Sequence, residues 1–257
     1  MPPVPPRRAH DPLRLVLYAQ THHAPHTQTP VSLLPLLPTP LTHLIVGAFH
    51  LNATPGHITL NDDPPSHPKF DSLWADVRAL QTHPNRPKKV LAMLGGAAPG
   101  TFTRLADPDP ARFEAYYAPL RDCLRARAFD GVDLDVEERV PLACPLRLLT
   151  RLRADFGPAF VVTLAPCASA LLHPRAPHLS GFSYFELAAE AARLVRPAPS
   201  SGAAAAAAPP LIAWFNVQLY NGWGDARQMG AYLGAVARAG WDPRRVVLGV
   251  LTAARNG

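Results

Sequence analysis

The sequence predicts an α/β fold in which parallel strands alternate with helices. Short apolar runs rich in β-branched residues recur along the chain, and amphipathic helical patterns separate them. Strands that are covered on both faces are almost continuously apolar, as these runs are. Successive runs begin roughly 30 to 50 residues apart, which is enough for the crossover helix that parallel pairing requires. We therefore expect a single domain over residues 1–257.

Seven runs are candidate strands, and each is short enough and apolar enough to be a buried strand. In chain order they are Leu13–Tyr18, His43–His50, Val90–Leu94, Gly131–Val136, Phe160–Ala165, Leu211–Leu219 and Val246–Leu251.

Helical patterns occupy the intervals between these runs. Leu73, Val77 and Leu80 share one face of a helix after the second strand. The segment Arg112–Arg127 also has helical periodicity, and we expect Pro119 to kink or restart it because proline lacks the N–H that an interior turn uses.

The C-terminal third has one more helix and one unusual segment. Asp225 is a candidate N-cap and Gly240 a candidate stop for this helix. Its apolar stripe consists of Met229, Tyr232, Leu233 and Val236. The low-complexity segment Pro197–Pro210, with its alanine run between prolines, is expected to be a surface loop.

Seven strands in a β-α repeat fit either a doubly wound sheet or an eight-stranded barrel. No GxGxxG motif follows the first strand, where a dinucleotide-binding sheet would have it. We therefore predict a (β/α)8 TIM barrel in which only seven strands are evident. No eighth strand follows Leu251 before Gly257, so we expect the first and seventh strands to expose edges and the chain to be less stable than a complete relative.

Composition excludes several classes of protein. Only 17% of the residues are charged, and the apolar runs are too short to cross a membrane. The net charge is +6, but the arginines are scattered and lack the interleaved aromatics of a nucleic-acid surface. We expect no nucleic-acid partner, no membrane partner and no cofactor. We also expect a monomer.

Cysteine, histidine and the N-terminus give little evidence for a metal site or for secretion. Cys123, Cys144 and Cys167 are too far apart for a CxxC site and are odd in number, so we expect buried free thiols and a reducing compartment. There is no HExxH motif. The N-terminal residues show no apolar signal segment, which makes a cytoplasmic location the default; secretion would require a different N-terminus.

The chemistry is concentrated in the segment FDGVDLDVEE, residues 129–138. Alternate residues of a strand share a face, so Asp133, Asp135 and Glu137 point one way while the intervening apolar residues point the other. We expect the acidic set to face the barrel axis near the C-terminal end, where barrel enzymes have their sites. Carboxylates spaced roughly 7 Å apart repel one another, which raises at least one pKa and keeps a general acid protonated.

Two other interpretations of these carboxylates stay open at this point. The strand end could simply be solvated, although the alternation with valine and leucine argues against that. Clustered carboxylates also bind Mg²⁺ or Ca²⁺, but Leu134 and Val136 stand where a calcium loop needs polar residues. We expect no metal.

The same segment resembles the DxxDxDxE signature of glycoside hydrolase family 18, the chitinases and related endo-β-N-acetylglucosaminidases. Asp130, Asp133, Asp135 and Glu137 fill every position of the signature. Two further elements resemble family motifs. These are Gly95 and Gly96, which match the SxGG motif, and Gln218, Tyr220 and Asn221, which match QxYN. The closest resemblance is to the short single-domain fungal chitinases.

The resemblance implies a retaining, substrate-assisted mechanism on β-1,4-linked N-acetylglucosamine polymers. Glu137 would protonate the glycosidic oxygen, and the substrate's own 2-acetamido carbonyl would attack the anomeric carbon. Asp135 would orient the acetamide and Asp133 would support Asp135. Tyr220 would hydrogen-bond the acetamido oxygen.

The remaining expectations concern substrate binding. Gln218 and Asn221 would shape the same subsite as Tyr220. Tyr18 and Trp223 are candidates for contact with sugar rings. For Phe49 and Trp214, core packing is the expected role.

One residue departs from the family pattern. Met93 stands where SxGG has serine, which removes a hydroxyl that in the family supports the aspartates. The alternative to an enzyme is a chitinase-like lectin that binds chitin or its oligosaccharides without turnover. Because lectin-like members commonly lose the acid, the presence of Glu137 favours the enzyme. A metal-dependent hydrolase that uses the same acidic cluster is a third hypothesis.

Overall fold

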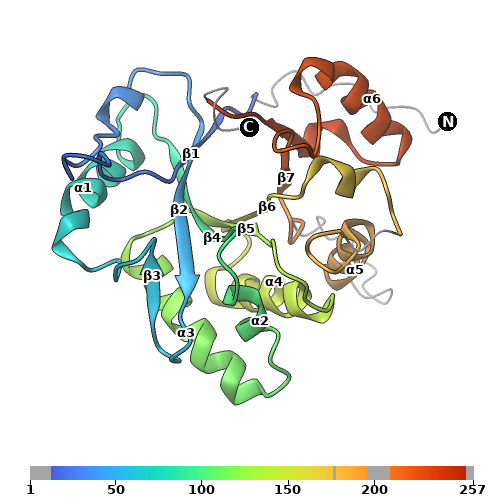
Figure 1. The fold of residues 1–257 in the computed structure, drawn as a ribbon, viewed down its shortest axis with the longest axis horizontal. Coiled ribbons are helices and arrows are strands. Elements are labelled where there is room, and N and C mark those ends of the chain that lie inside the picture. The colour runs from blue at the N-terminus through green and yellow to red at the C-terminus, as the bar shows by residue number, and fades with distance from the viewer. Residues whose placement is uncertain (1–12, 176–177, 196–208, 253–257) are drawn as a thin grey trace, which may run out of the picture.

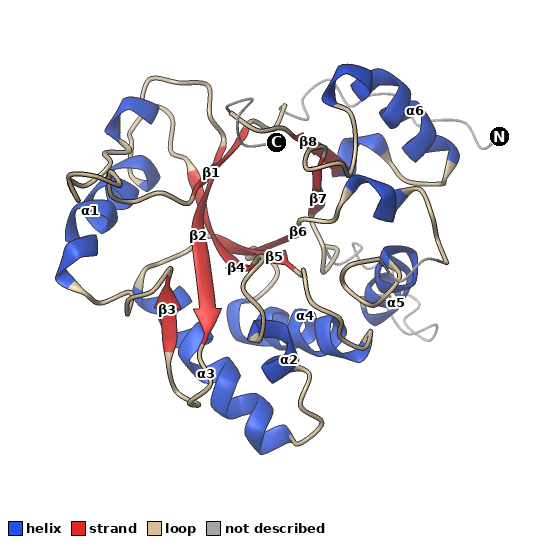
Figure 2. Cartoon of the chain, in the orientation of Figure 1, coloured by secondary structure: helices blue, strands red, loops and turns tan. Residues whose placement is uncertain are grey.

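In the computed structural model, parallel strands form a nearly closed barrel with helices around it (Figures 1 and 2). The structure describes residues 13–175, 178–195 and 209–252. Within these residues the barrel strands pair in parallel, each with the next along the ring from the first strand to the last, which confirms the predicted α/β barrel. The seven barrel strands are β1 Val16–Ala19, β2 His43–Leu51, β4 Lys89–Gly95, β5 Gly131–Asp135, β6 Val161–Leu164, β7 Trp214–Gln218 and β8 Val246–Gly249.

Helices cover the outside of this ring (Figure 2). They bury the outer faces of the strands in the main hydrophobic core. The α-helices are α1 Asp71–Gln81, α2 Thr101–Leu105, α3 Pro110–Ala126, α4 Ala143–Phe156, α5 Tyr184–Leu194 and α6 Met229–Arg238. Short 3₁₀ helices are found at Leu34–Leu36, Pro68–Phe70, Ala168–Leu171, Ala226–Gln228 and Pro243–Arg245. In the described part of the chain no helix has the length and apolarity that a membrane span needs.

Three details differ from the sequence-based expectations. Strand β3, Ile58–Leu60, pairs antiparallel with the end of β2 and was not predicted, because three residues are too few to show a period. Helix α3 runs through Pro119 without restarting, since its apolar residues stay buried on both sides of the proline. Asp225 caps the 3₁₀ turn at Ala226–Gln228, directly ahead of α6.

The low-complexity segment 197–210 lies almost entirely outside the described residues. Its expected loop structure therefore stays a prediction.

Side chains of the barrel strands alternate between an inner and an outer set. Ile45, Leu91 and Met93 form a small cluster separate from the main core, and Tyr18 packs against it from β1. Met93 is paired in register with Asp133 on the neighbouring strand. Because paired residues of adjacent strands point to the same face, the aspartates of β5 belong to the inner set.

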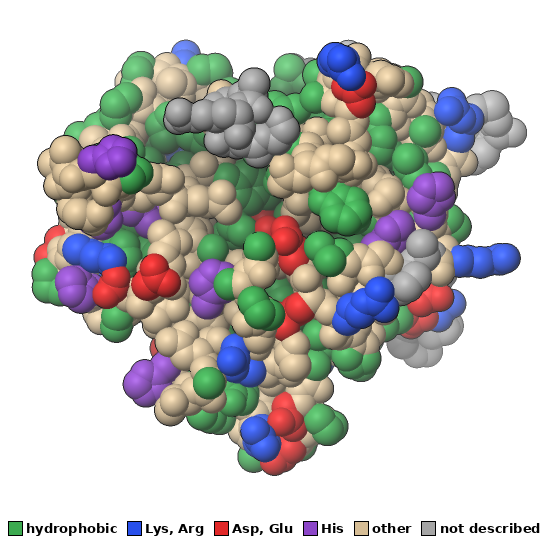
Figure 3. Space-filling view, in the orientation of Figure 1, with side chains coloured by type: hydrophobic (Ala, Val, Ile, Leu, Met, Phe, Trp, Pro, Cys, Tyr) green, Lys and Arg blue, Asp and Glu red, His purple; other side chains and the backbone are tan. Residues whose placement is uncertain are grey.

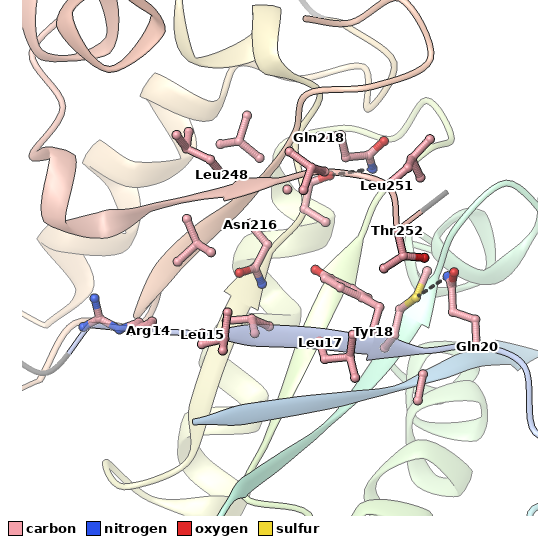
Figure 4. A pocket seen from close by; sticks show the side chains of 18 of the residues that line it. Arg14, Leu15, Leu17, Tyr18, Gln20, Asn216, Gln218, Leu248, Leu251 and Thr252 are labelled. Carbon is pink, nitrogen blue, oxygen red and sulfur yellow. Dashed lines mark hydrogen bonds between the residues drawn. The ribbon is translucent and has the colours of Figure 1, made fainter. Parts of the chain in front are cut away.

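No ladder joins β1 to β8 within the described residues, and a cleft of about 1290 Å³ lies between these two strands (Figure 4). A hydrogen bond from the Arg14 guanidinium to the Arg244 carbonyl oxygen, 2.9 Å long, crosses the gap at one end. Both edges contribute apolar lining. The apolar lining residues from the two edges include Leu13, Leu15, Leu17, Val246, Leu248, Val250 and Leu251.

These open edges predict a tendency of the 257-residue chain to self-associate, because unpaired strand edges flanked by apolar side chains can pair with another chain. Val250, which is 52% exposed beside β8, is a suitable position for a charge. We expect Val250→Lys to slow aggregation on warming several-fold, measured by light scattering. Leu194→Lys is the control, since Leu194 is equally exposed but lies on α5, away from this gap. An equal effect of both substitutions would contradict the prediction.

Candidate active site

Three acidic residues of the segment 129–138, Asp133, Asp135 and Glu137, lie on the inside of the barrel and at its mouth. Asp133 and Asp135 are buried on β5, and Glu137 follows the strand and is half-buried. Viewed down the barrel, acidic side chains are visible near the centre of the molecular face (Figure 3). The strand therefore places two carboxyl groups inside the barrel, and the segment after it places a third near the surface.

Asp133 receives hydrogen bonds from three different strands. The Tyr18 hydroxyl on β1 donates to Oδ2 at 2.8 Å, and the Asn216 amide on β7 donates to Oδ1 at 3.0 Å. The Thr163 hydroxyl on β6 also donates to Oδ1. The Trp214 indole N–H donates to the Asn216 amide oxygen at 2.9 Å, which turns the amide nitrogen toward Asp133. The centre of the barrel is thus arranged around one carboxyl group.

Gln218 joins the other two acidic side chains. Its Nε2 lies 3.0 Å from Asp135 Oδ1, 3.3 Å from Glu137 Oε1 and 3.0 Å from the Ala165 carbonyl oxygen. An amide nitrogen has two hydrogens, so it cannot fully serve three acceptors. A proton on one of the two carboxyl groups would relieve this shortage.

Burial and mutual repulsion raise the pKa of both aspartates. Burial is the main cause at Asp135, and the charges of Glu137 and Asp133 raise its pKa further, well above the ordinary value. Burial also raises the pKa of Asp133, while the hydrogen bonds from Thr163, Tyr18 and Asn216 oppose that shift. Part of the cluster is therefore protonated at a pH where an exposed aspartate would be ionised.

The predicted binding residues divide into two groups. Tyr18, Gln218 and Tyr220 line the cleft, and Tyr18 and Gln218 can be seen there in Figure 4. The Tyr18 hydroxyl already has a partner, because it donates to Asp133. Asn221 and Trp223 are exposed on the loop after β7 and are not part of the cleft lining.

Glu137 lies next to this cleft in a smaller hollow. Gln218 and Ala165 line both spaces, so the hollow adjoins the cleft.

Met93 occupies the inner position at which the SxGG motif has serine. Its Sδ accepts a hydrogen bond from Gln20 Nε2 at 3.2 Å, drawn as a dashed line in Figure 4. The Thr163 hydroxyl bonds Asp133 from the strand on the other side of β5. Asp133 therefore has a hydroxyl donor although Met93 cannot provide one.

Sequence reasoning missed Thr163 and Asn216. Each is a single polar residue within an apolar strand run, and single polar residues in such runs are common on their own. The spacing of Asn216 and Gln218, two residues apart on one strand, was a usable signal, because it places both amides on the same face.

The structure also places the two aromatic residues expected in the core and the three cysteines. Phe49 and Trp214 are buried, as expected for core residues. Cys144 and Cys167 are buried free thiols, and Cys123 is a half-buried one. In the described part of the chain, no group of three or more histidine, cysteine, aspartate or glutamate side chains is arranged to hold a metal ion.

Comparison with known proteins identifies the family. The chain is similar to the chitinase ChiC from Aspergillus fumigatus, with 43% identity over 95% of this chain and 80% of that one and a TM-score of 0.82. It is also similar to a fungal endo-β-N-acetylglucosaminidase from glycosyl hydrolase family 18, with 39% identity over 95% and 79% of the two chains and a TM-score of 0.81. The chain belongs to glycoside hydrolase family 18. The resemblance found in the DxxDxDxE segment is thereby confirmed.

More distant members share the fold. A family 18 chitinase from Pseudoalteromonas aurantia superposes with a TM-score of 0.67 at 16% identity, over 95% of this chain and 82% of that one. The sequence matches no family model and no curated protein. The family assignment therefore depends on the fungal structures.

The raised pKa of Asp135 has a consequence for stability. A carboxyl group whose pKa is higher in the folded than in the unfolded state stabilises the fold only when protonated, and stability falls as the pH rises through the folded pKa. We expect Asp135→Asn to raise the free energy of unfolding at pH 7 by about 1.4 kcal/mol per unit of pKa elevation, and the gain to vanish below pH of about 3.9. Urea unfolding at both pH values measures this.

Asp242→Asn is the matched control for this prediction. The pKa of Asp242 is lowered, mainly by its side-chain hydrogen bond with Arg244, so the same substitution should decrease stability at pH 7. A gain for Asp135→Asn that persists unchanged at low pH would contradict the raised pKa.

Proposed function

We propose that this family 18 chain is a chitinase-type glycosidase that cleaves β-1,4-linked N-acetylglucosamine polymers by a retaining, substrate-assisted mechanism. The main support is Glu137, which stands at the mouth of the barrel and is bridged by Gln218 to a buried Asp135. The fungal neighbours described as a chitinase and an endo-β-N-acetylglucosaminidase support the same substrate class. Chitin or N-acetylglucosamine oligosaccharides are the proposed partners of a monomeric chain.

Glu137 is the proposed general acid. Of the three acidic residues it alone is half-buried, while Asp133 and Asp135 are buried, so its carboxyl group is the most accessible to a glycosidic oxygen at the barrel mouth. A general acid of this kind donates its proton to the leaving group in the transition state. Its proton would pass to the leaving-group oxygen as the bond to the anomeric carbon breaks.

Asp135 is proposed to act on the substrate's acetamido group. As a carboxylate it would accept the amide N–H and leave the carbonyl oxygen free to attack the anomeric carbon, forming a cyclic oxazolinium ion. The negative charge of Asp135 stabilises the positive charge that develops on this ring. Water would then open the ring, giving its proton to Glu137 and restoring the configuration at the anomeric carbon.

The residues around the aspartates are proposed to hold the acetamido group. Tyr220 lines the cleft next to Gln218, so its hydroxyl is available to the acetamido oxygen. Asp133 supports Asp135 from below, held in place by Thr163 and Asn216. From the exposed loop after β7, Asn221 is proposed to shape the same subsite as Tyr220, and Trp223 to contact a sugar ring.

The general-acid role predicts that Glu137→Gln abolishes turnover. The amide cannot donate a proton to the leaving group, so release of fluorophore from a fluorogenic triacetylchitotrioside should fall by a factor of about 10² to 10⁴. Glu190→Gln is the control, because Glu190 is on α5 and pairs with Arg193 far from the site. Oligosaccharide binding without turnover by the parent chain would favour the lectin alternative.

The role of Tyr220 predicts a different kinetic change. Tyr220→Phe keeps the ring but removes the hydroxyl, so we expect kcat to fall about 10- to 100-fold while the variant stays folded. The control is Tyr232→Phe, because the Tyr232 hydroxyl donates to the Ala168 carbonyl oxygen on the outer side of the barrel. An unchanged kcat in Tyr220→Phe would remove this residue from the mechanism.

A further inference from the structure

Glu138, the residue after the proposed acid, has its own set of contacts. Glu138 bonds to groups other than those around Glu137, which contacts Gln218. The carboxylate of Glu138 reaches Gly100, at the end of the connection that follows the neighbouring strand β4, and the first turn of α2. The backbone N–H groups of Gly100 and Phe102 donate to it at 2.9 and 2.6 Å.

Thr103 adds to this contact. Its backbone N–H donates to Glu138 Oε2 at 3.2 Å, and its hydroxyl donates to the same oxygen. Gly100, at the N-terminal end of α2, has no side chain to cap these amides. The carboxylate from the other loop therefore satisfies backbone donors that the local sequence leaves open.

The other end of the same short segment is also fixed. The Val140 N–H donates to the Ser180 carbonyl oxygen at 3.0 Å. Gly181 lies against the backbone of Arg139 and Val140, where an added Cβ would come within 3.0 Å. The segment that carries Glu137 is thus attached on one side to the start of α2 and on the other to the loop around residue 180.

Glu137 itself is weakly restrained. In the part of the chain that the structure describes, its carboxyl group accepts a single hydrogen bond, which Gln218 donates at 3.3 Å. Because its own side chain has so little support, its position depends on the backbone on either side.

We propose that Glu138 is a positioning residue that holds the backbone of Glu137 in place for proton donation. This inference rests on the proposed function of Glu137. The contacts with Gly100, Phe102 and Thr103 act on the loop that carries the acid, and small displacements of a catalytic group reduce rates strongly. Removal of the Glu138 carboxylate should therefore affect the chemical step more than substrate binding.

Two substitutions separate position from charge. Glu138→Ala removes the charge and every acceptor, whereas Glu138→Gln removes the same charge but keeps one acceptor oxygen. We expect kcat to fall about 30-fold in the alanine variant with KM within about threefold, and Glu138→Gln to retain kcat within about threefold. Equal losses in both variants, or no loss in either, would overturn the proposal.

Asp109→Ala is the control for a loss of helix capping alone. Asp109 accepts the Ala111 N–H at the start of α3, as Glu138 does for α2, but it has no contact with the segment of Glu137. This variant should lose comparable thermal stability while kcat stays at the parent value. A parallel loss of kcat would show that the effect of Glu138→Ala is general destabilisation.

Hydrogen exchange of the backbone amides tests the positioning role of Glu138 without a measurement of turnover. An inactive parent chain would count against the proposed function, and exchange would then decide the role of Glu138. We expect amides of residues 136–140 to exchange several-fold faster in Glu138→Ala than in the parent, Glu138→Gln or Asp109→Ala. Unchanged exchange in this segment would overturn the proposal.

Discussion

The burial of two carboxyl groups on one barrel strand is the constraint on which the site depends. Asp133 and Asp135 lie inside the ring, where an ionised side chain without partners would be strongly unfavourable. The barrel meets this cost with hydrogen bonds donated from three other strands, by Tyr18, Thr163 and Asn216 for Asp133 and by Gln218 for Asp135. The inner polar residues of these strands are therefore explained by the aspartates.

The same arrangement gives the three carboxyl groups different burial and different numbers of hydrogen-bond donors. Asp133 is satisfied by three donors, Asp135 shares one amide with Glu137, and Glu137 emerges half-buried at the barrel mouth. Burial and repulsion between these groups favour retention of a proton on Asp135. A proton donor next to a buried negative charge suits a reaction in which a leaving group is protonated while positive charge develops on the sugar.

The sequence was sufficient for the barrel, the inward direction of the aspartates and the family. Long apolar runs and the segment 129–138 are strong local signals, and both depend on short-range periodicity. The partners of Asp133 were not predictable, because Thr163 and Asn216 become neighbours of Asp133 only when distant strands are placed in the ring. Glu138 was missed for the same reason. Its partners are at the start of α2, far away in the sequence. The sequence alone shows only a second acidic residue next to Glu137.

A carbon-13 NMR titration of the side-chain carboxyl carbons from pH 3 to 9 tests the central claim most directly, because it follows Asp133, Asp135 and Glu137 individually. Burial and like charge predict that Asp135 titrates well above the ordinary range of an aspartate, and burial predicts a raised pKa for Asp133 as well. Titration of Asp133 and Asp135 at ordinary values, about 4 for exposed carboxyls, would contradict a buried, mutually repelling pair.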